Sequence, residues 1–403
     1  MRASTVSSDL DAFAFASAAP GLEQLLAFEL RRLGLRGVRA EPGGVAFRAS
    51  AMDDVRRANL WLRTAHRILM RVAEFRADSF SLLEQKARSV EWPRWLAPGA
   101  RVALSVTCHK SRLYHSTAVA ERVASAIGRR VPGLALVALN DAEEASEAEA
   151  FVQRVFVRLD HDHCTLSLDT SGEHLHRRGY RRAIGEAPLR ETLAAAMILS
   201  GGLQARVPGL AIDHATPVPQ WLVDPMCGSG TLPIEAARLL CNVAPGRDRA
   251  FAFQRWPDDD PTRWRALLDD ARSREIALPE GFVIEASDID AEALRAARLN
   301  AAAAGLAPAL IDWHVRPLDA LPSAKAPGVL LSNPPYGHRL GDARDLRNFY
   351  RTAGRIFRER RSGSKLGLLL PDRGFEALLG IAVETKFQTR NGGIPVHLSV
   401  ADL

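Results

Sequence analysis

The sequence predicts an α/β fold in its second half, built on a parallel sheet that ends in an antiparallel hairpin, and an α+β arrangement in its first half. Three observations support this prediction. The 403 residues exceed what one hydrophobic core usually organises, so we expect two or three domains. After residue 180, apolar strand-like runs alternate with helical periods, which is typical of right-handed βαβ units. Near the end, Asn391-Gly392-Gly393 separates two strand-like runs and predicts a tight hairpin turn.

The first half contains short strands and helices without a regular alternation. Apolar residues at helical spacing predict helices over residues 20–34, 52–64, 81–89 and 116–127. Alternating or β-branched runs predict strands over residues 11–16, 45–48, 68–75, 102–108, 151–159 and 165–169. The Asp160 to His163 segment between the last two runs predicts a hairpin turn.

The second half repeats a strand followed by a helix. We expect strands over residues 221–224, 282–287, 312–315, 329–332, 366–370, 385–390 and 394–400. We expect helices over residues 189–200, 231–240, 291–304 and 343–357. Residues from about 244 to 279 separate one of these helices from the next strand, and we interpret them as an insertion.

Composition favours a globular cytoplasmic protein with a polyanionic partner. Apolar residues make up 47% of the chain and charged residues 25%. No apolar run approaches the roughly 20 residues of a membrane span. The net charge of +6 suits a nucleic acid. The four cysteines, Cys108, Cys164, Cys227 and Cys241, are scattered and form no Cys-x-x-Cys pair, which predicts a reducing compartment. No histidine cluster has zinc-ligand spacing, so we expect no structural metal.

A glycine loop follows the strand predicted at residues 221–224 and opens the next helix. This position lies at the carboxyl edge of a parallel sheet, where ligands bind. Glycines let the backbone approach a ligand, and free N–H groups at the start of a helix suit a carboxylate. We therefore predict ligand contacts from Asp224, Pro225, Cys227, Gly228, Gly230 and Thr231. An ordinary strand-to-helix turn is one alternative; a dinucleotide site is another, although bulky residues occupy its first glycine position.

Acidic residues follow the next two strands of the same half. Asp288 ends one strand and can accept hydrogen bonds from ribose hydroxyls, and Ile289 beside it is included in the ligand site. Asp290 is better placed to cap the following helix. Asp319, beyond the strand at residues 312–315, could accept from an adenine amino group or be a solvated turn residue.

The segment Ser-Asn-Pro-Pro-Tyr-Gly at residues 332–337 follows another apolar strand. An exocyclic amine of a nucleobase is a poor nucleophile because its lone pair is delocalised into the ring. A site that methylates it should therefore accept both of its N–H groups. Asn333 can supply a side-chain oxygen and Pro334 a carbonyl, while Pro335 helps to hold the backbone and Tyr336 offers a flat face to the base. We predict these four residues as catalytic; the alternative is a proline-rich turn with a surface tyrosine.

These segments together resemble the THUMP-containing RNA guanine-N2 methyltransferases of bacteria. The resemblance includes the stretches at residues 179–182 and 187–195, and residues 109–116 are similar to the THUMP domain of the group that acts on large-subunit ribosomal RNA. It implies a ferredoxin-like unit at residues 1–66, an RNA-binding THUMP domain at 67–172 and a Rossmann-like class I methyltransferase domain at 173–403.

The resemblance also implies a cofactor and a product. S-adenosylmethionine would be the methyl donor, held by Asp224, Gly228, Gly230, Asp288 and Asp319, and N2-methylguanosine would be the product. The Asn-Pro-Pro-Tyr motif also serves enzymes that methylate the adenine N6 amine, so the motif itself does not choose the base.

Two basic segments are candidates for RNA contacts. Lys110 and Arg112 follow a predicted strand close to Tyr114, a combination that suits phosphates and an unpaired base, or a solvated loop. A denser cluster joins the front domains to the methyltransferase domain, and from it we predict RNA contacts by Arg177, Arg178, Tyr180 and Arg182.

The leading hypothesis is a methyltransferase that acts on the N2 amine of a guanosine, with 23S ribosomal RNA favoured as substrate. Three alternatives stay open: guanine-N2 methylation of transfer RNA, adenine-N6 methylation of RNA or DNA, and an RNA-binding assembly factor whose methyltransferase domain is inactive.

Overall fold

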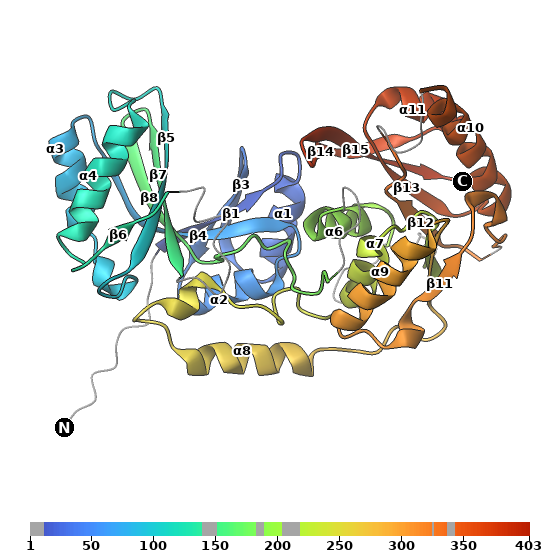
Figure 1. Cartoon of the computed structure of the whole chain (residues 1–403), viewed down its shortest axis with the longest axis horizontal. Helices are drawn as coiled ribbons and strands as arrows, with labels where there is room; N and C mark the ends of the chain where they lie inside the picture. The colour runs from blue at the N-terminus through green and yellow to red at the C-terminus, as the bar shows by residue number, and fades with distance from the viewer. Residues whose placement is uncertain (1–11, 139–150, 183–188, 204–217, 325, 337–342) are drawn as a thin grey trace.

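The computed structural model describes residues 12–138, 151–182, 189–203, 218–324, 326–336 and 343–403. Two parts lie side by side, each built on its own sheet, and helix α8 (Pro261–Ser273) runs along one edge beneath the region between them (Figure 1). No helix in the described ranges combines the length and the apolar character needed to cross a membrane.

The front part is one continuous eight-stranded sheet in the order β2-β3-β1-β4-β8-β7-β5-β6. Its strands are β1 (Ala12–Ala18), β2 (Arg36–Glu41), β3 (Gly44–Ala49), β4 (Ala65–Arg76), β5 (Arg101–His109), β6 (Ala135–Leu136), β7 (Val152–Asp160) and β8 (His163–Asp169). Its helices are α1 (Glu23–Arg32), α2 (Met52–Trp61), α3 (Phe80–Arg88) and α4 (Ser116–Gly128).

Strand β4 joins the two front units. It pairs antiparallel with β1 on one side, where Met70 lies opposite Ala14, and with β8 on the other, where Met70 lies opposite Leu168. The boundary that we predict at residue 66 therefore falls at the start of a strand that both units share. The sequence analysis does not predict strands β2 and β6, because both are edge strands without a buried residue and so lack the apolar alternation.

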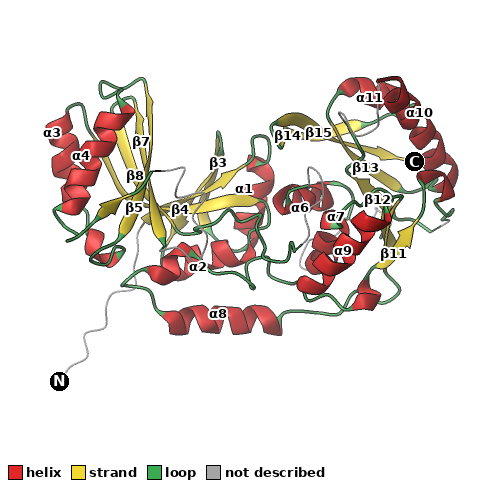
Figure 2. Ribbon diagram, viewed as in Figure 1, coloured by secondary structure: helices red, strands yellow, loops and turns green. Residues whose placement is uncertain are grey.

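The second part confirms the predicted parallel sheet with its terminal hairpin. Its strand order is β11-β10-β9-β12-β13-β15-β14, and β15 runs antiparallel to both of its neighbours (Figure 2). The strands are β9 (Trp221–Asp224), β10 (Val283–Asp288), β11 (Asp312–Val315), β12 (Val329–Ser332), β13 (Lys365–Leu370), β14 (Glu384–Asn391) and β15 (Ile394–Asp402). The helices are α6 (Glu191–Ser200), α7 (Thr231–Leu240), α9 (Ala291–Ala303), α10 (Ala343–Arg360) and α11 (Arg373–Leu379), the last of which is too short for its period to be recognised in the sequence.

The centre of this sheet determines where a ligand can bind. Strand β9 lies between β10 and β12. After β9 the chain first adds β10 and β11 on one side of the sheet, and then adds β12 and the later strands on the other side. Such a switch point opens a crevice outside the carboxyl ends of the two strands. The glycine loop follows β9 and the Asn-Pro-Pro-Tyr segment follows β12, so both predicted motifs lie at this crevice.

The insertion predicted at residues 244–279 fastens the second part to the front sheet. The Trp256 indole N–H donates to Oε1 of Gln153 at 2.8 Å, and Gln153 lies on β7. Arg56 on α2 forms an ion pair with Asp259 at 2.5 Å, with both side chains less than a twentieth exposed. The insertion is therefore a structural clamp that reaches both front units.

Asp259 and its neighbour Asp258 provide a matched test of this clamp. Asp259→Ala should lower the free energy of unfolding by about 3 kcal/mol, because it removes the buried partner of Arg56 and leaves that guanidinium with the half-exposed Asp53. Asp258→Ala removes an exposed ion pair with Arg94 and should change the free energy of unfolding by less than about 1 kcal/mol. Urea unfolding followed by tryptophan fluorescence measures both, and equal small losses would contradict the clamp.

Candidate active site

The glycine loop is held against the end of β10. The backbone N–H of Gly228 donates to Oδ2 of Asp288 at 2.8 Å, and the N–H of Cys227 donates to the carbonyl of Ser287 at 3.0 Å. The N–H of Asp290 donates to Oδ1 of Asp288 at 3.0 Å. The Asp288 carboxylate therefore shapes the loop in addition to the ribose role that we predict for it.

The two glycines of the loop are needed for different reasons. Both have positive φ, 53° at Gly228 and 82° at Gly230. A Cβ at Gly228 would meet no protein atom within 4 Å, so this backbone borders open space that a ligand can fill. A Cβ at Gly230 would lie 2.9 Å from the side chains of both Ala297 and Trp313, so Gly230 is required by packing against α9 and β11 rather than by a ligand.

Asp224 joins the two loops. It is 2% exposed, and its Oδ1 accepts from the Ser332 hydroxyl at 2.6 Å and from the Met226 N–H at 3.2 Å. Burial raises the pKa of this carboxyl to about 7, against the lowering effect of these hydrogen bonds. The bond to Ser332 connects the end of β9 to the end of β12, while the direct donor contact that we predict for Asp224 stays a prediction.

The other predicted donor residues lie around this loop. Pro225 and Cys227 are buried, and burial raises the pKa of the Cys227 thiol, which keeps it protonated. Ile289 is 73% exposed beside Asp288, and Asp319 is exposed in a short turn after β11. The Asp290 side chain accepts from the Glu292 N–H at 2.8 Å, which confirms the predicted helix cap.

The Asn-Pro-Pro-Tyr loop after β12 contains a buried acceptor that no described residue uses. Oδ1 of Asn333 is shielded from solvent and has no hydrogen-bond partner among the described residues. The rest of the loop is braced: the Tyr350 hydroxyl donates to the Pro335 carbonyl at 3.2 Å, and Nδ2 of Asn391 donates to the Tyr336 hydroxyl at 2.9 Å. Pro334 is buried beneath them. The structure thus holds the loop in place and leaves Asn333 free to bind a donor group.

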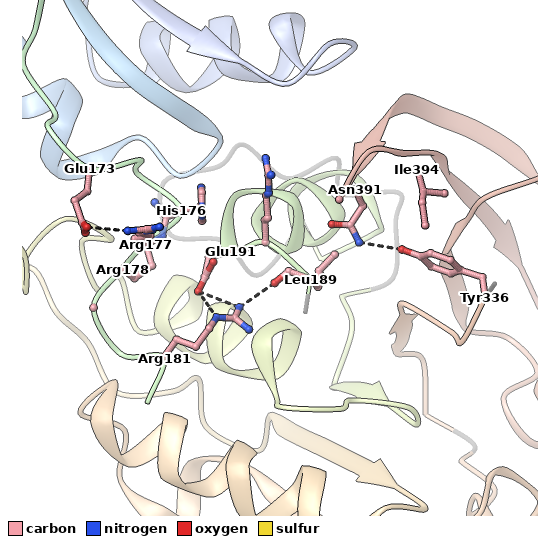
Figure 3. Close-up of a pocket in the computed structure, with 13 residues that line it drawn as sticks. Glu173, His176, Arg177, Arg178, Arg181, Leu189, Glu191, Tyr336, Asn391 and Ile394 are labelled. Carbon is pink, nitrogen blue, oxygen red and sulfur yellow. Dashed lines mark hydrogen bonds and ion pairs between the residues drawn. The ribbon is translucent and has the colours of Figure 1, made fainter. Parts of the chain in front are cut away.

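A cavity of about 590 Å³ opens beside Tyr336 (Figure 3). This volume lies within the range of about 300 to 1,000 Å³ that is usual for small-molecule sites. Its walls come from the linker between the two parts, from the start of α6, from the Asn-Pro-Pro-Tyr loop and from the tip of the β14–β15 hairpin. The lining residues are Glu173, His176, Arg177, Arg178, Gly179, Arg181, Leu189, Arg190, Glu191, Tyr336, Asn391, Gly392 and Ile394.

Two of the predicted RNA contacts in the linker are wrong. Arg178 is 2% exposed, and its guanidinium donates to the carbonyls of Leu175 and Arg63 at 2.6 Å each. Tyr180 is also 2% exposed, and its hydroxyl donates to Oε1 of Glu235 at 3.1 Å. Both side chains are almost wholly buried and make their hydrogen bonds inside the protein, which contradicts the predicted contacts with an RNA backbone.

The remaining linker residues stay candidates for RNA contact. Arg177 is exposed and pairs with Glu173 at 2.9 Å, and Arg182 is exposed while its backbone N–H donates to Oδ1 of Asn300 at 2.8 Å. Arg177 and Arg182 are exposed whereas Arg178 is buried, and the local sequence does not indicate this difference.

The second basic segment forms an exposed loop after β5. Lys110 and Arg112 are exposed there, and Tyr114 is 68% exposed with its ring 4.0 Å from that of His115. Their RNA contacts stay predictions. The fold also brings His109 and His161 to the Asp160 carboxylate at 2.9 and 2.8 Å, a surface cluster that sequence spacing does not indicate.

Sequence reasoning missed three residues that the tertiary structure brings to the site. Asn391 lies in the predicted hairpin but contacts Tyr336 only in the fold. Arg181 donates from Nη2 to the Thr231 hydroxyl at 3.0 Å, at the helix start that follows the glycine loop. Arg190 lines the cavity at the start of α6. Residues 187 and 188 of the stretch before α6, and residue 337 of the segment after β12, lie outside the described ranges.

Comparison with known families assigns all three regions of the chain. Residues 14–69 match the RlmL ferredoxin-like domain, residues 77–169 match the THUMP domain and residues 178–399 match the RMKL-like methyltransferase domain. The Synechocystis sp. protein slr0064, named as a candidate RNA methyltransferase, is 33% identical over 389 residues, which are 95% of each chain. The ribosomal RNA large subunit methyltransferase K/L of Syntrophotalea carbinolica is 36% identical over 399 residues, or 96% of this chain and 53% of that protein. This chain therefore spans about half the length of the K/L relatives.

Solved structures agree over nearly the whole chain. A predicted N6-adenine-specific DNA methylase from Listeria monocytogenes has a TM-score of 0.79 and 31% identity, covering 97% of this chain and 96% of its own. SMU.472, a candidate methyltransferase crystallised with SAH, has a TM-score of 0.79 and 30% identity, covering 97% and 98%. These matches confirm the fold and the family resemblance that the motifs indicate. The chain belongs to the RMKL-like methyltransferase family, with a ferredoxin-like and a THUMP domain in front of its methyltransferase domain.

Proposed function

We propose that this chain transfers the methyl group of S-adenosylmethionine to the exocyclic N2 amine of a guanosine in 23S ribosomal RNA. The observation that carries this proposal is the buried Oδ1 of Asn333, which has no partner among the described residues and lies in the loop after β12, at the ligand-binding edge of the sheet. A buried acceptor without a partner costs about 1 to 3 kcal/mol, a cost that a donor group of a bound ligand would offset. An amine N–H of the target base would be that ligand.

The chemistry of an aromatic amine explains why an acceptor is required there. Hydrogen bonds from the two N–H groups to the Asn333 oxygen and to the Pro334 carbonyl would hold the amine with its lone pair directed at the methyl group. When the new N–C bond forms, the amine becomes cationic and its N–H groups become stronger donors, so the same two acceptors stabilise the transition state more than the ground state. The S–CH3 bond of the donor would break as the N–C bond forms, S-adenosylhomocysteine would leave as a neutral thioether, and the nitrogen would release one proton to water.

The donor side fits S-adenosylmethionine. The space beside Gly228 is open, the Asp288 carboxylate is partly exposed and Ile289 presents an apolar side chain next to it. The Asp288 oxygens retain lone pairs for ribose hydroxyls, and Ile289 can pack on the adenine ring. When bound, S-adenosylmethionine supplies an electrophilic methyl group on a sulfonium; the protein supplies orientation and a site from which water is excluded.

The choice of RNA and base rests on the relatives. The K/L proteins are named for large-subunit ribosomal RNA, and a THUMP domain precedes the catalytic domain. The second candidate function is adenine-N6 methylation, which is favoured by the name of the Listeria protein and which the same acceptor pair could serve.

Nucleoside analysis tests the proposal directly. The purified chain, incubated with isotope-labelled S-adenosylmethionine and with ribosomal and transfer RNA from a strain that lacks the gene, should produce labelled N2-methylguanosine in 23S ribosomal RNA alone. Asn333→Ala protein serves as the blank. Label in N6-methyladenosine would overturn the guanine assignment, and label in transfer RNA would overturn the assignment to ribosomal RNA. Donor binding without label in any nucleic acid would favour an inactive assembly factor.

Separate variants distinguish the acceptor side from the donor side. Asn333→Ala should lower kcat by about 100-fold or more, because it removes an acceptor that acts mainly in the transition state. The Kd of the donor should stay within about twofold, since Asn333 is not part of the glycine loop. Single-turnover kinetics and calorimetric titration with S-adenosylhomocysteine measure the two quantities.

Asp288→Ala should instead weaken the donor, by about 10- to 100-fold for the loss of charge-assisted hydrogen bonds. Because Asp288 also accepts from the Gly228 N–H, Asp288→Asn is the control that keeps one acceptor for the loop. Its loss of affinity should be smaller than that of the alanine variant. Equal loss of donor affinity in Asn333→Ala and Asp288→Ala would contradict the assigned roles.

A further inference from the structure

Among the arginines of the cavity wall, Arg190 has a guanidinium charge that no described carboxylate neutralises. Of the other three arginines in the cavity wall, Arg177 pairs with Glu173 and Arg181 pairs with Glu191, while Arg178 is buried among carbonyls. Arg190 is exposed, and although its backbone carbonyl accepts from the N–H groups of Leu193 and Ala194, its guanidinium has neither a hydrogen bond nor an ion pair with any described residue. The cavity therefore carries a net cation next to the catalytic loop.

Three histidines lie close to this cation. The rings of His174 and His176 stack with centroids 5.5 Å apart, and the ring of His66 meets that of His174 edge-on at 6.4 Å. Burial is the main cause that lowers the pKa of His66 to about 4, of His174 to about 3 and of His176 to about 2, and the Arg190 charge lowers each of them further. All three rings are thus neutral at physiological pH and can donate one N–H each.

Two further polar groups of the cavity wall lack partners. Nδ1 of His176 and Nη1 of Arg181 are shielded from solvent and make no hydrogen bond with the described residues. An arginine donor without an acceptor is costly to bury. Together with Arg190, these groups form a wall that offers donors and positive charge, and the two carboxylates in the wall are already used by Arg177 and Arg181. Such a wall suits an anion.

We propose that Arg190 and His176, whose ring is stacked on that of His174, bind a phosphodiester group of the RNA strand that carries the target base. This inference rests on the proposed function, since it takes the base to lie at Asn333 and Tyr336. The cavity touches Tyr336, and none of its described lining residues comes from the glycine loop, so the anion belongs to the acceptor strand rather than to the carboxylate of the donor. A guanidinium suits phosphate because its planar fork donates two hydrogen bonds at once. Neutral imidazoles add N–H donors without adding repulsion between cations.

Kinetics with a matched control test the role of Arg190. Arg190→Gln should raise the KM for RNA by about 10-fold and change kcat by less than about twofold, and it should reduce the slope of log KM against log salt by about 1. Arg272→Gln removes the same charge from an exposed, paired position on α8 outside the cavity and should change neither quantity. Donor affinity should be unchanged in both variants. A loss of donor affinity in Arg190→Gln, or equal effects in the two variants, would overturn the proposal.

Histidine NMR tests the same site without any methylation. In protein labelled at histidine Cε1, a short single-stranded RNA should shift the signals of His174 and His176, which are assigned with Gln variants, and Arg190→Gln should abolish the shifts. Inorganic phosphate at equal phosphate concentration should shift them much less. Equal shifts with phosphate would mean a site for free anions, and no shifts with either probe would remove the site altogether. Shifts with RNA in a protein that methylates no nucleic acid would refute the proposed function while supporting this subsite.

Discussion

One buried carboxylate, Glu235 on α7, holds the linker between the two parts of the chain. Its Oε1 accepts from the Tyr180 hydroxyl at 3.1 Å, and its Oε2 lies 3.7 Å from the Arg178 guanidinium, with the Arg178 and Glu235 side chains 1% exposed. Arg178 also donates to the carbonyl of Arg63 in the front part. Removing one member of such a group leaves an uncompensated charge in the interior, at a cost of about 3 to 5 kcal/mol. The relative position of the two parts depends on this interaction.

The same helix connects that interaction to the glycine loop. Helix α7 begins directly after the glycine loop, and Arg181 reaches its first residue, Thr231, from the linker. The insertion fastens the opposite side, where Arg249 donates to the backbone carbonyls of His174 and Arg177 at 2.8 and 3.1 Å. The linker is thus held from both sides, so in our proposal an RNA strand bound by the front part would meet the glycine loop in one geometry. This arrangement supplies positioning, the main resource available for methylating a weak nucleophile.

Within the site, satisfied and unsatisfied polar groups divide according to role. Asp224 and Ser332 satisfy one another and connect the two loops, and Asn391 satisfies the Tyr336 hydroxyl. Asn333 Oδ1 and His176 Nδ1 are buried without partners among the described residues, and these are the atoms that we propose to bind the RNA. A bound ligand that supplied their partners would offset the cost of burying them.

The sequence alone determined the class of fold, the family and the two motifs at the sheet edge. These features depend on local periods and on short segments, such as the Gly228 loop and the Asn333 to Tyr336 segment, whose backbone requirements are written in adjacent residues. Only the tertiary structure decided which of several similar side chains border the cavity. Arg178 and Arg190 are both arginines in a basic stretch, yet one is buried against Glu235 and the other borders the cavity. The sequence likewise did not predict the contact of Asn391 with Tyr336 or the clamp formed by the insertion. Burial and pairing depend on elements far apart in the chain, and no local sequence pattern determines which of these elements come into contact.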